Sequence, residues 1–226
     1  MPTAFDLSAG VAILLAALGG ALGGAADRFA TRWPEHDEEH PPGRAVDWRT
    51  LVCVAVGGLA VWLLVRRFGG EPLGHGADPL ALAVFGAWFT TLVIGLATDL
   101  DQRLLPDVLT LPVIPVAAVY AVSGSNPLVG DAWGLAVVAA IAIPLVLYLP
   151  SIPFGAGAFG MGDVKFLAGM GLLLGGERAL SGTLAGLLLA GVVLVVLLAT
   201  RRIGRRTYVP FGPFLILGAL WGVFLP

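Results

Sequence analysis

Residues 79–101 read PLALAVFGAWFTTLVIGLATDLD, an uncharged apolar run that ends in two aspartates, Asp99 and Asp101. A run of about 20 apolar residues is long enough to cross the hydrocarbon core of a bilayer as a helix. A carboxylate is costly at the edge of such a run, so Asp99 here and Asp163 at the edge of a later run are the first candidates for function. The segment therefore predicts a membrane helix that carries functional side chains at one end.

The remainder of the chain has the same character. Its residues are 58% hydrophobic and 12% charged, and its mean hydropathy is +0.91, as expected of a protein surrounded mostly by lipid. We expect an all-α, polytopic integral membrane helix bundle that forms a single domain over residues 1–226. Eight spans are predicted, near residues 7–26, 50–65, 79–97, 107–123, 132–149, 163–176, 181–200 and 210–225.

Glycine and proline are expected to shape these spans. The 32 glycines cluster within apolar runs, for example in residues 18–24, where they let helix backbones approach closely. Pro112, Pro115 and Pro144 interrupt other runs and should kink them. The single cysteine, Cys53, lies inside an apolar run, which favours an inert buried thiol and excludes an internal disulfide.

The basic residues predict an orientation in the membrane. In the eight-span arrangement, ten Lys and Arg residues fall on one side and three on the other. The ten are Arg28, Arg32, Arg44, Arg49, Arg103, Lys165, Arg201, Arg202, Arg205 and Arg206, and the three are Arg66, Arg67 and Arg178. Cytoplasmic loops carry the basic excess, so both termini are expected outside the cytoplasm, and Asp99 and Asp163 at its face.

Residues 32–49 are predicted to form a short acidic cytoplasmic loop. His36 and His40, with Asp37, Glu38 and Glu39 between them, are possible metal ligands. The flanking prolines leave little room for the helix that would align the two histidines, which favours a solvated loop without metal. His75, between two glycines in an outer loop, is given no role. The net charge of −2 and the absence of a basic patch argue against a nucleic-acid partner.

Two interpretations of the aspartates compete. Asp107 and Asp163 each precede an apolar run, where a carboxylate commonly caps a helix. Capping does not explain Asp99, which ends an apolar helix where the helix dipole disfavours negative charge. The second interpretation is proteolysis by two carboxyl groups that share a proton, one activating a water and the other protonating the scissile carbonyl oxygen. Gly160 and Gly162 would then adopt positive φ and approach an extended substrate.

Three segments resemble signatures of one enzyme family. Residues 99–112, DLDQRLLPDVLTLP, resemble the first signature of the bacterial type IV prepilin peptidases. Residues 160–165, GMGDVK, resemble the second, a G-x-G-D motif shared with archaeal preflagellin peptidases and presenilin-type proteases. Residues 210–213, PFGP, are similar to a third. Residues 23–34 are similar to the family's G-S-F-x-N-x-x-x-x-R-x-P, with Gly24 replacing the serine and Asp27 the asparagine.

The resemblance implies roles for individual residues. Asp99 and Asp163 correspond to the catalytic pair of the family, without metal or cofactor. The supporting motif residues are Asp101, Pro106, Asp107, Gly160, Gly162, Lys165, Pro210, Gly212 and Pro213. Larger family members also carry two Cys-x-x-Cys pairs associated with N-methylation. This chain has one cysteine and a short acidic loop instead, so the resemblance implies peptidase activity without the methyltransferase.

The implied activity is an aspartic endopeptidase of the bacterial plasma membrane. It would remove the basic leader of prepilins or pseudopilins at the cytoplasmic face, and the acidic loop would attract that leader. Two alternatives belong to other classes. A small proton-coupled transporter would need polar residues deeper in the spans, and a non-catalytic membrane factor would only bind pilin helices.

Overall fold

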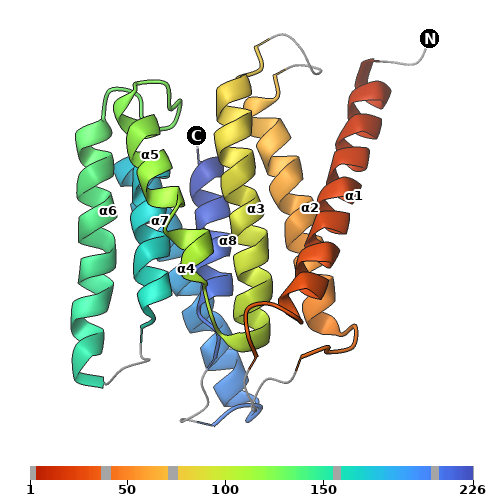
Figure 1. Cartoon of the computed structure of the whole chain (residues 1–226), viewed down its shortest axis with the longest axis vertical. Coiled ribbons are helices and arrows are strands. Elements are labelled where there is room, and N and C mark those ends of the chain that lie inside the picture. The colour runs from red at the N-terminus through yellow and green to blue at the C-terminus, as the bar shows by residue number, and fades with distance from the viewer. Residues whose placement is uncertain (1–3, 37–41, 71–75, 155–158, 205–208, 226) are drawn as a thin grey trace. The chain divides into compact units, whose positions relative to one another are not determined.

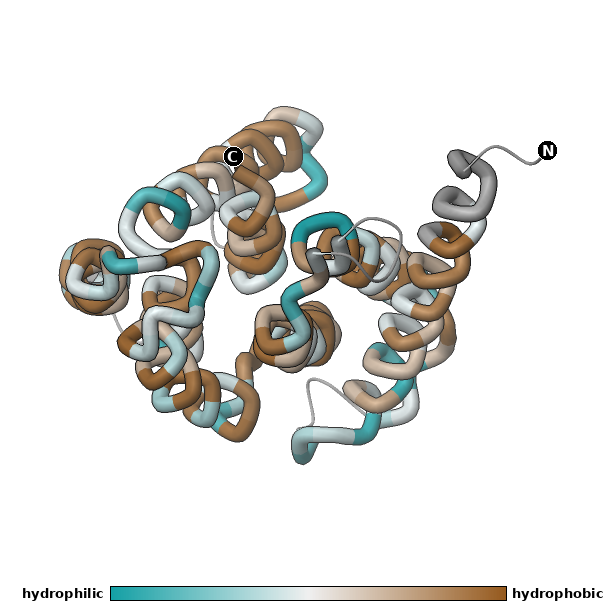
Figure 2. The backbone as a smooth tube through the Cα atoms, turned by 90° about the horizontal axis from the view of Figure 1, so that it is seen from above, coloured by the Kyte–Doolittle hydropathy of each residue, from teal (hydrophilic) through white to brown (hydrophobic). Residues whose placement is uncertain are grey.

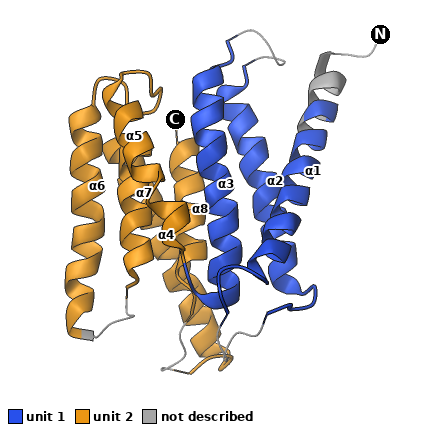
Figure 3. Cartoon of the chain, in the orientation of Figure 1, with its two compact units in different colours: residues 1–104 blue, residues 105–226 orange. Residues whose placement is uncertain are grey.

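A computed structural model describes residues 4–36, 42–70, 76–154, 159–204 and 209–225. These residues form α-helices, one short 3₁₀ helix and turns, without a strand, which confirms the all-α expectation for the described part of the chain (Figure 1). The chain divides into two compact units, Met1–Leu104 and Leu105–Pro226 (Figure 3). The single-domain organisation stays a prediction. Unit 1 is Met1–Leu104 and unit 2 is Leu105–Pro226.

The described residues of unit 1 form three helices, α1 (Ala4–Ala30), α2 (Trp48–Phe68) and α3 (Pro79–Gln102). Local chemistry starts two of them. The Asp47 carboxylate accepts a hydrogen bond of 2.9 Å from the Arg49 N–H, and the Asp78 carboxylate accepts one of 2.9 Å from the Ala81 N–H, so each satisfies a free donor of the first turn. Pro79, at the first position of α3, adds a backbone already suited to a helix.

Glycines bring α1 and α2 into close contact within unit 1. A Cβ placed on Gly23 would lie 2.0 Å from the Cys53 carbonyl oxygen, and one on Gly57 would lie 2.4 Å from the Gly19 carbonyl oxygen. These distances leave no room for a side chain, so the expectation that glycines serve packing is confirmed here. The Cys53 thiol is buried at this contact, as expected.

Unit 2 contains α4 (Asp107–Thr110), α5 (Val113–Val122), α6 (Trp133–Tyr148), the 3₁₀ helix η1 (Leu149–Phe154), α7 (Met161–Ala199) and α8 (Gly212–Phe224). The predicted span 107–123 is interrupted at Pro112, which lies between α4 and α5, as expected of a proline. By contrast, α6 continues past Pro144, so that proline does not end its helix.

α7 consists of two helical segments that meet at Gly175. Its 39 residues would make a straight helix of about 58 Å, far longer than one bilayer crossing. Gly175 has φ 77° and ψ −179°, which is not helical, and its positive φ is accessible to glycine at little cost. A Cβ placed on Gly182 would lie 2.7 Å from the Met170 Cε, although these residues would be about 18 Å apart along a straight helix. α7 therefore folds back at Gly175.

A buried asparagine completes this reversal. Asn126 is fully buried, and its side-chain amide donates a hydrogen bond of 2.9 Å to the Leu173 carbonyl oxygen, just before the break. Its side-chain oxygen accepts a hydrogen bond of 2.9 Å from the Leu128 N–H. Carbonyls that lose their helical partner must be satisfied elsewhere when water is excluded, and Asn126 supplies one such donor.

Five helices in the described residues are long and apolar enough to cross a membrane. They cover residues 13–30, 48–68, 79–102, 133–153 and 161–199, and two shorter apolar stretches cover 107–122 and 212–224. Eight spans are therefore not confirmed: residues 163–176 and 181–200 largely correspond to the two segments of α7 on either side of Gly175, and residues 107–123 are interrupted at Pro112. Helix bodies are mostly hydrophobic, and hydrophilic positions concentrate near their ends (Figure 2).

Candidate active site

Asp99 lies in the last turn of α3, in unit 1. Its exposed fraction is 5%, and Thr98 before it is fully buried. The helix ends at Arg103, whose φ of 56° is left-handed and whose N–H donates a hydrogen bond of 2.9 Å to the Asp99 carbonyl oxygen. The predicted catalytic acid is therefore a buried side chain at a helix C-terminus, a position that the helix dipole does not favour.

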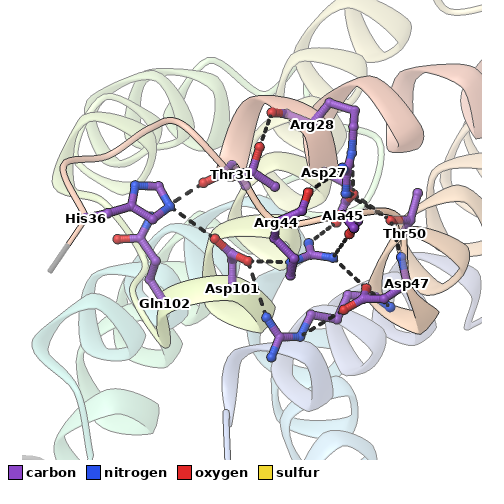
Figure 4. Close-up of polar contacts among 12 residues, drawn as sticks. Asp27, Arg28, Thr31, His36, Arg44, Ala45, Asp47, Thr50, Asp101 and Gln102 are labelled. Carbon is purple, nitrogen blue, oxygen red and sulfur yellow. Dashed lines mark hydrogen bonds and ion pairs between the residues drawn. The ribbon is translucent and has the colours of Figure 1, made fainter. Parts of the chain in front are cut away.

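Asp101 is part of an ion-pair network at the same end of α3 (Figure 4). Its Oδ1 accepts hydrogen bonds from Arg44 Nε at 2.7 Å and from Arg49 Nη1 at 3.3 Å. Its Oδ2 lies 3.2 Å from His36 Nε2. Both carboxylate oxygens are thus engaged by groups from the α1–α2 loop and the start of α2, which fits the supporting role expected for Asp101.

Arg44 joins this network to Asp27 and Asp47. Its Nη2 donates to Asp27 Oδ1 at 2.6 Å, and its Nη1 donates to the Asp47 carboxylate. Burial by itself lowers the pKa of the Arg44 guanidinium, but hydrogen bonds to Asp101 and Asp27 and the charges of Asp27 and Asp47 outweigh it, and the pKa is raised above its ordinary value. Arg44 is therefore held in its charged form.

Asp27 is the most buried acid of the network, and it lies within the apolar helix α1. Arg28 pairs with its Oδ2, which also accepts a hydrogen bond of 2.7 Å from Thr50 Oγ1. Arg28 donates a further hydrogen bond of 2.8 Å to the Arg44 carbonyl oxygen. Both oxygens of the Asp27 carboxylate therefore have hydrogen-bond partners, as a buried carboxylate requires.

The sequence did not identify Arg28, Arg44, Arg49 or Thr50 as residues of this site. A signal was present in Asp27, because a carboxylate inside an apolar run needs a cation nearby. The metal interpretation of the loop receives no support from His36, which contacts Asp101 and Gln102. No group of three potential metal-ligating side chains occurs among the described residues, and residues 37–40, the other proposed ligands, lie outside them.

In unit 2, Asp163 lies in the first turn of α7. Its Oδ2 accepts a hydrogen bond of 3.2 Å from the Gly160 N–H, so the capping interpretation is confirmed for this half-buried carboxylate. The expectation that Gly160 and Gly162 adopt positive φ is wrong for this structure. Gly160 has φ −73°, and Gly162 lies in the first helical turn, outside the positive-φ glycines. Gly162 serves packing instead, since a Cβ there would lie 2.9 Å from the Leu105 carbonyl oxygen.

The second half of the first signature lies beside the second signature. Pro106 precedes α4, and the carboxylate of Asp107 in its first turn accepts a hydrogen bond of 2.6 Å from Lys165 Nζ on α7. Asp107 thus pairs with a lysine across two motifs. With the Gly162–Leu105 packing, this contact fixes the start of α7 against α4.

The PFGP segment also meets the second signature within unit 2. The Phe211 ring lies edge-on to the Phe159 ring, with 5.9 Å between centroids, and Phe159 immediately precedes Gly160. Gly212 and Pro213 form the first turn of α8, and Pro210 precedes it. Unit 2 therefore brings together Pro106, Asp107, Gly160, Gly162, Asp163, Lys165, Pro210, Gly212 and Pro213, while Asp99 and Asp101 belong to unit 1.

Comparison with known proteins relates the chain to one enzyme family. The model of the type IV leader peptidase family matches residues 89–200, a range that contains both Asp99 and Asp163. The chain belongs to this family. A prepilin leader peptidase/N-methyltransferase of Stutzerimonas stutzeri is 31% identical over 76% of the chain and 57% of its own length. Proteins of the same name from Pseudomonas putida and Pseudomonas aeruginosa are 33% and 34% identical, over 66% and 55% of the chain and 52% and 44% of their own lengths.

The chain spans about half the length of these leader peptidase relatives. No solved structure matches it significantly. The residues matched by the leader peptidase model begin in α3 and end after α7, so Asp27, Arg44 and Asp47 lie outside the match. The network around Arg44 therefore joins Asp101, inside the match, to residues outside it.

Proposed function

We propose that the protein is an aspartic endopeptidase that removes the N-terminal leader from type IV prepilins or pseudopilins. The observation that carries the proposal is the family match over residues 89–200, which contains both predicted catalytic acids. Relatives are named as prepilin leader peptidases, which supports the substrate class. The match does not favour a proton-coupled transporter or a factor that only binds pilin helices.

The proposed chemistry needs two carboxyl groups and one water. One carboxylate of the Asp99–Asp163 pair takes a proton from the water, which then attacks the scissile carbonyl carbon, and the other carboxyl group protonates the carbonyl oxygen. The resulting tetrahedral species collapses with protonation of the leaving amine. In this scheme the two acids share one proton, so that one acts as the base while the other acts as the acid.

We propose a site at the cytoplasmic face of the bacterial plasma membrane. The excess of basic residues near Asp99 and Asp163 supports this orientation under the positive-inside rule. The reversal of α7 at Gly175 supports counting its two segments as separate crossings, as the eight-span arrangement requires. Residues 107–122 and 212–224 would provide the remaining crossings. With an even number of crossings between Asp99 and Asp163, both acids would face one compartment.

The proposed substrate segment is the junction between a basic leader and a hydrophobic helix. The acidic loop over residues 32–49 would attract the leader, an effect on association rate that salt would screen. Methyl transfer, which the relatives' name includes, is not part of the proposal, since the family feature associated with it is cysteine-rich and this chain has one cysteine.

Incubation of the purified protein in detergent with a leader-bearing type IV prepilin tests this proposal. We expect a product shortened at its N-terminus, detected by mass spectrometry, with the wild-type protein. The product should vanish with Asp99→Asn and with Asp163→Asn, and persist with Asp131→Asn, an exposed acid outside the signatures. Cleavage that survives either of the first two substitutions would refute the paired-acid mechanism.

A further inference from the structure

Arg44 connects three elements of unit 1 through three carboxylates. Asp27 belongs to α1, Asp47 precedes α2, and Asp101 lies in the last turn of α3. The guanidinium contacts all three, at 2.6 Å for Asp27 and 2.7 Å for Asp101 (Figure 4). A planar guanidinium can serve several carboxylates at once because its five donors point in fixed directions. A lysine at the same position would present a single point of charge.

The contacts of Arg44 are largely shielded from solvent. The side chains of Asp27, Asp101 and Arg44 are 1%, 5% and 16% exposed. Loss of one partner from such a cluster leaves charges uncompensated, which makes the remaining geometry unfavourable. The arrangement of Asp27, Asp47 and Asp101 therefore depends on Arg44.

Asp101 transmits this anchoring to the turn that carries Asp99. Terminal turns of helices fray unless they are tied down, and Asp101 is tied by Arg44, Arg49 and His36. Gln102 adds a contact of 3.4 Å from its side-chain amide to the Pro34 carbonyl oxygen. Asp99 lies two residues before Asp101 in this anchored turn. The Arg103 N–H donates a hydrogen bond to the Asp99 carbonyl oxygen and ends the helix.

We propose that Arg44 is a positioning residue for leader cleavage. Through Asp101 it holds the last turn of α3 and so fixes the direction in which the Asp99 carboxyl group points, and Asp101 is the partner of Arg44 rather than a member of the catalytic pair. This inference rests on the proposed function. It extends the site to the α1–α2 loop, outside the residues that the family model matches.

Steady-state cleavage of a leader-bearing prepilin by Arg44→Gln, Arg44→Lys and Asp101→Asn tests the proposal. A displacement of about 1 Å in a reacting group costs up to about 100-fold in rate, so kcat should fall about 10- to 100-fold in Arg44→Gln while KM stays within about twofold. In Asp101→Asn, kcat should fall by a similar factor. The double variant of Arg44→Gln and Asp101→Asn should have a kcat only slightly below that of either single variant. Arg44→Lys should have a kcat between those of Arg44→Gln and the wild type. Arg202→Gln, an exposed arginine of unit 2, is the matched control and should retain wild-type values.

Three kinetic results would overturn the inference. One is a kcat of Arg44→Gln within about twofold of wild type, since misplacement should cost more. Another is a raised KM at unchanged kcat, which would make Arg44 a binding residue. The third is loss of cleavage in Asp101→Asn as complete as in Asp99→Asn, which would make Asp101 catalytic.

Hydrogen exchange separates this inference from the proposed function. In Arg44→Gln the amide hydrogens of residues 100–104 should exchange about tenfold faster than in the wild type, while those of α8 should not change. This measurement needs no substrate. If the wild-type protein failed to cleave prepilins, the proposed function would fail, and unchanged exchange at residues 100–104 would separately refute the anchoring of α3 by Arg44.

Discussion

Asp27 and Asp101 of unit 1 have surroundings that differ from those of Asp163 of unit 2. In unit 1, Asp27 and Asp101 are nearly inaccessible and are each contacted by two arginines. In unit 2, the Asp163 carboxylate is half-buried and accepts a hydrogen bond from the Gly160 N–H, and no arginine contacts it among the described residues. Asp101 and Asp163 both belong to the family signatures, but ion pairs with two arginines hold the Asp101 carboxylate and none is seen at Asp163 among the described residues.

The contacts of a carboxylate bear on whether it suits a structural or a catalytic role. A carboxylate whose two oxygens accept hydrogen bonds from fixed cationic donors has little room left to bind a water or a substrate. General acid–base catalysis requires a group that gains and loses a proton within the catalytic cycle. The ion pairs of Asp27 and Asp101 therefore fit a structural role, and the contacts of Asp163 are compatible with the catalytic role proposed for it.

Substitution of Asp163 gives the largest expected effect. Asp163→Asn removes the exchangeable proton at nearly constant volume, so kcat for prepilin cleavage should fall on the order of 10²- to 10⁴-fold, as for loss of a general acid or base. Thermal unfolding should remain close to that of the wild type, because an asparagine side-chain oxygen still accepts from the Gly160 N–H. If kcat fell less than tenfold, the assignment of chemistry to this acid would be wrong.

Substitution of Asp27 should act on stability instead. Asp27→Ala leaves Arg28 and Arg44 without a shared buried partner, and breaking a buried ion pair costs about 3–5 kcal/mol. The free energy of unfolding, measured by denaturation in mixed micelles, should fall by this amount. A loss below about 1 kcal/mol would show that the Asp27 cluster contributes little, and the contrast between the units would lose its basis.

Substitution of a tightly packed glycine in unit 2 should give a smaller effect, and a second glycine of the same unit provides the control. A Cβ on Gly218 would lie 2.2 Å from the Gly182 carbonyl oxygen, whereas one on Gly191 would meet no atom within 4 Å. Gly218→Ala should lower the free energy of unfolding by about 1–3 kcal/mol, as overpacking does. Gly191→Ala should leave the free energy of unfolding unchanged or raise it by up to about 1 kcal/mol, because alanine has a higher helix propensity than glycine. Equal effects would contradict this packing.

Local sequence features predicted several parts of the site. The end of α3 at Asp99 and Asp101, the capping role of Asp163 and the start of α8 at the PFGP segment all follow from where apolar runs meet charge, proline or glycine. The predicted break between residues 176 and 181 lies close to the observed reversal at Gly175. These features depend on residues close together in the chain.

The remaining features depend on contacts between distant residues. Nothing near Arg44 in the sequence indicates that its guanidinium would meet both Asp27 and Asp101, and only packing of α1 against α3 selects it from the other arginines of the loops. The backbone of Gly162 was mispredicted for the same reason. A G-x-G sequence permits positive φ, but contact with Leu105 already requires a glycine in an ordinary helical turn.

The Asp107–Lys165 pair gives the smallest expected effect and sharpens the contrast between the units. Its donor–acceptor distance of 2.6 Å is as short as those in unit 1, but the Lys165 and Asp107 side chains are 23% and 60% exposed. Solvent screens an exposed pair, so a double-mutant cycle of Asp107→Asn and Lys165→Met should give a coupling of about 0.2–1 kcal/mol in unfolding free energy, and less at high salt. A coupling above about 2 kcal/mol would mean that burial does not distinguish this pair from the Arg44 network. A short distance would then be sufficient for a strong pair at either site.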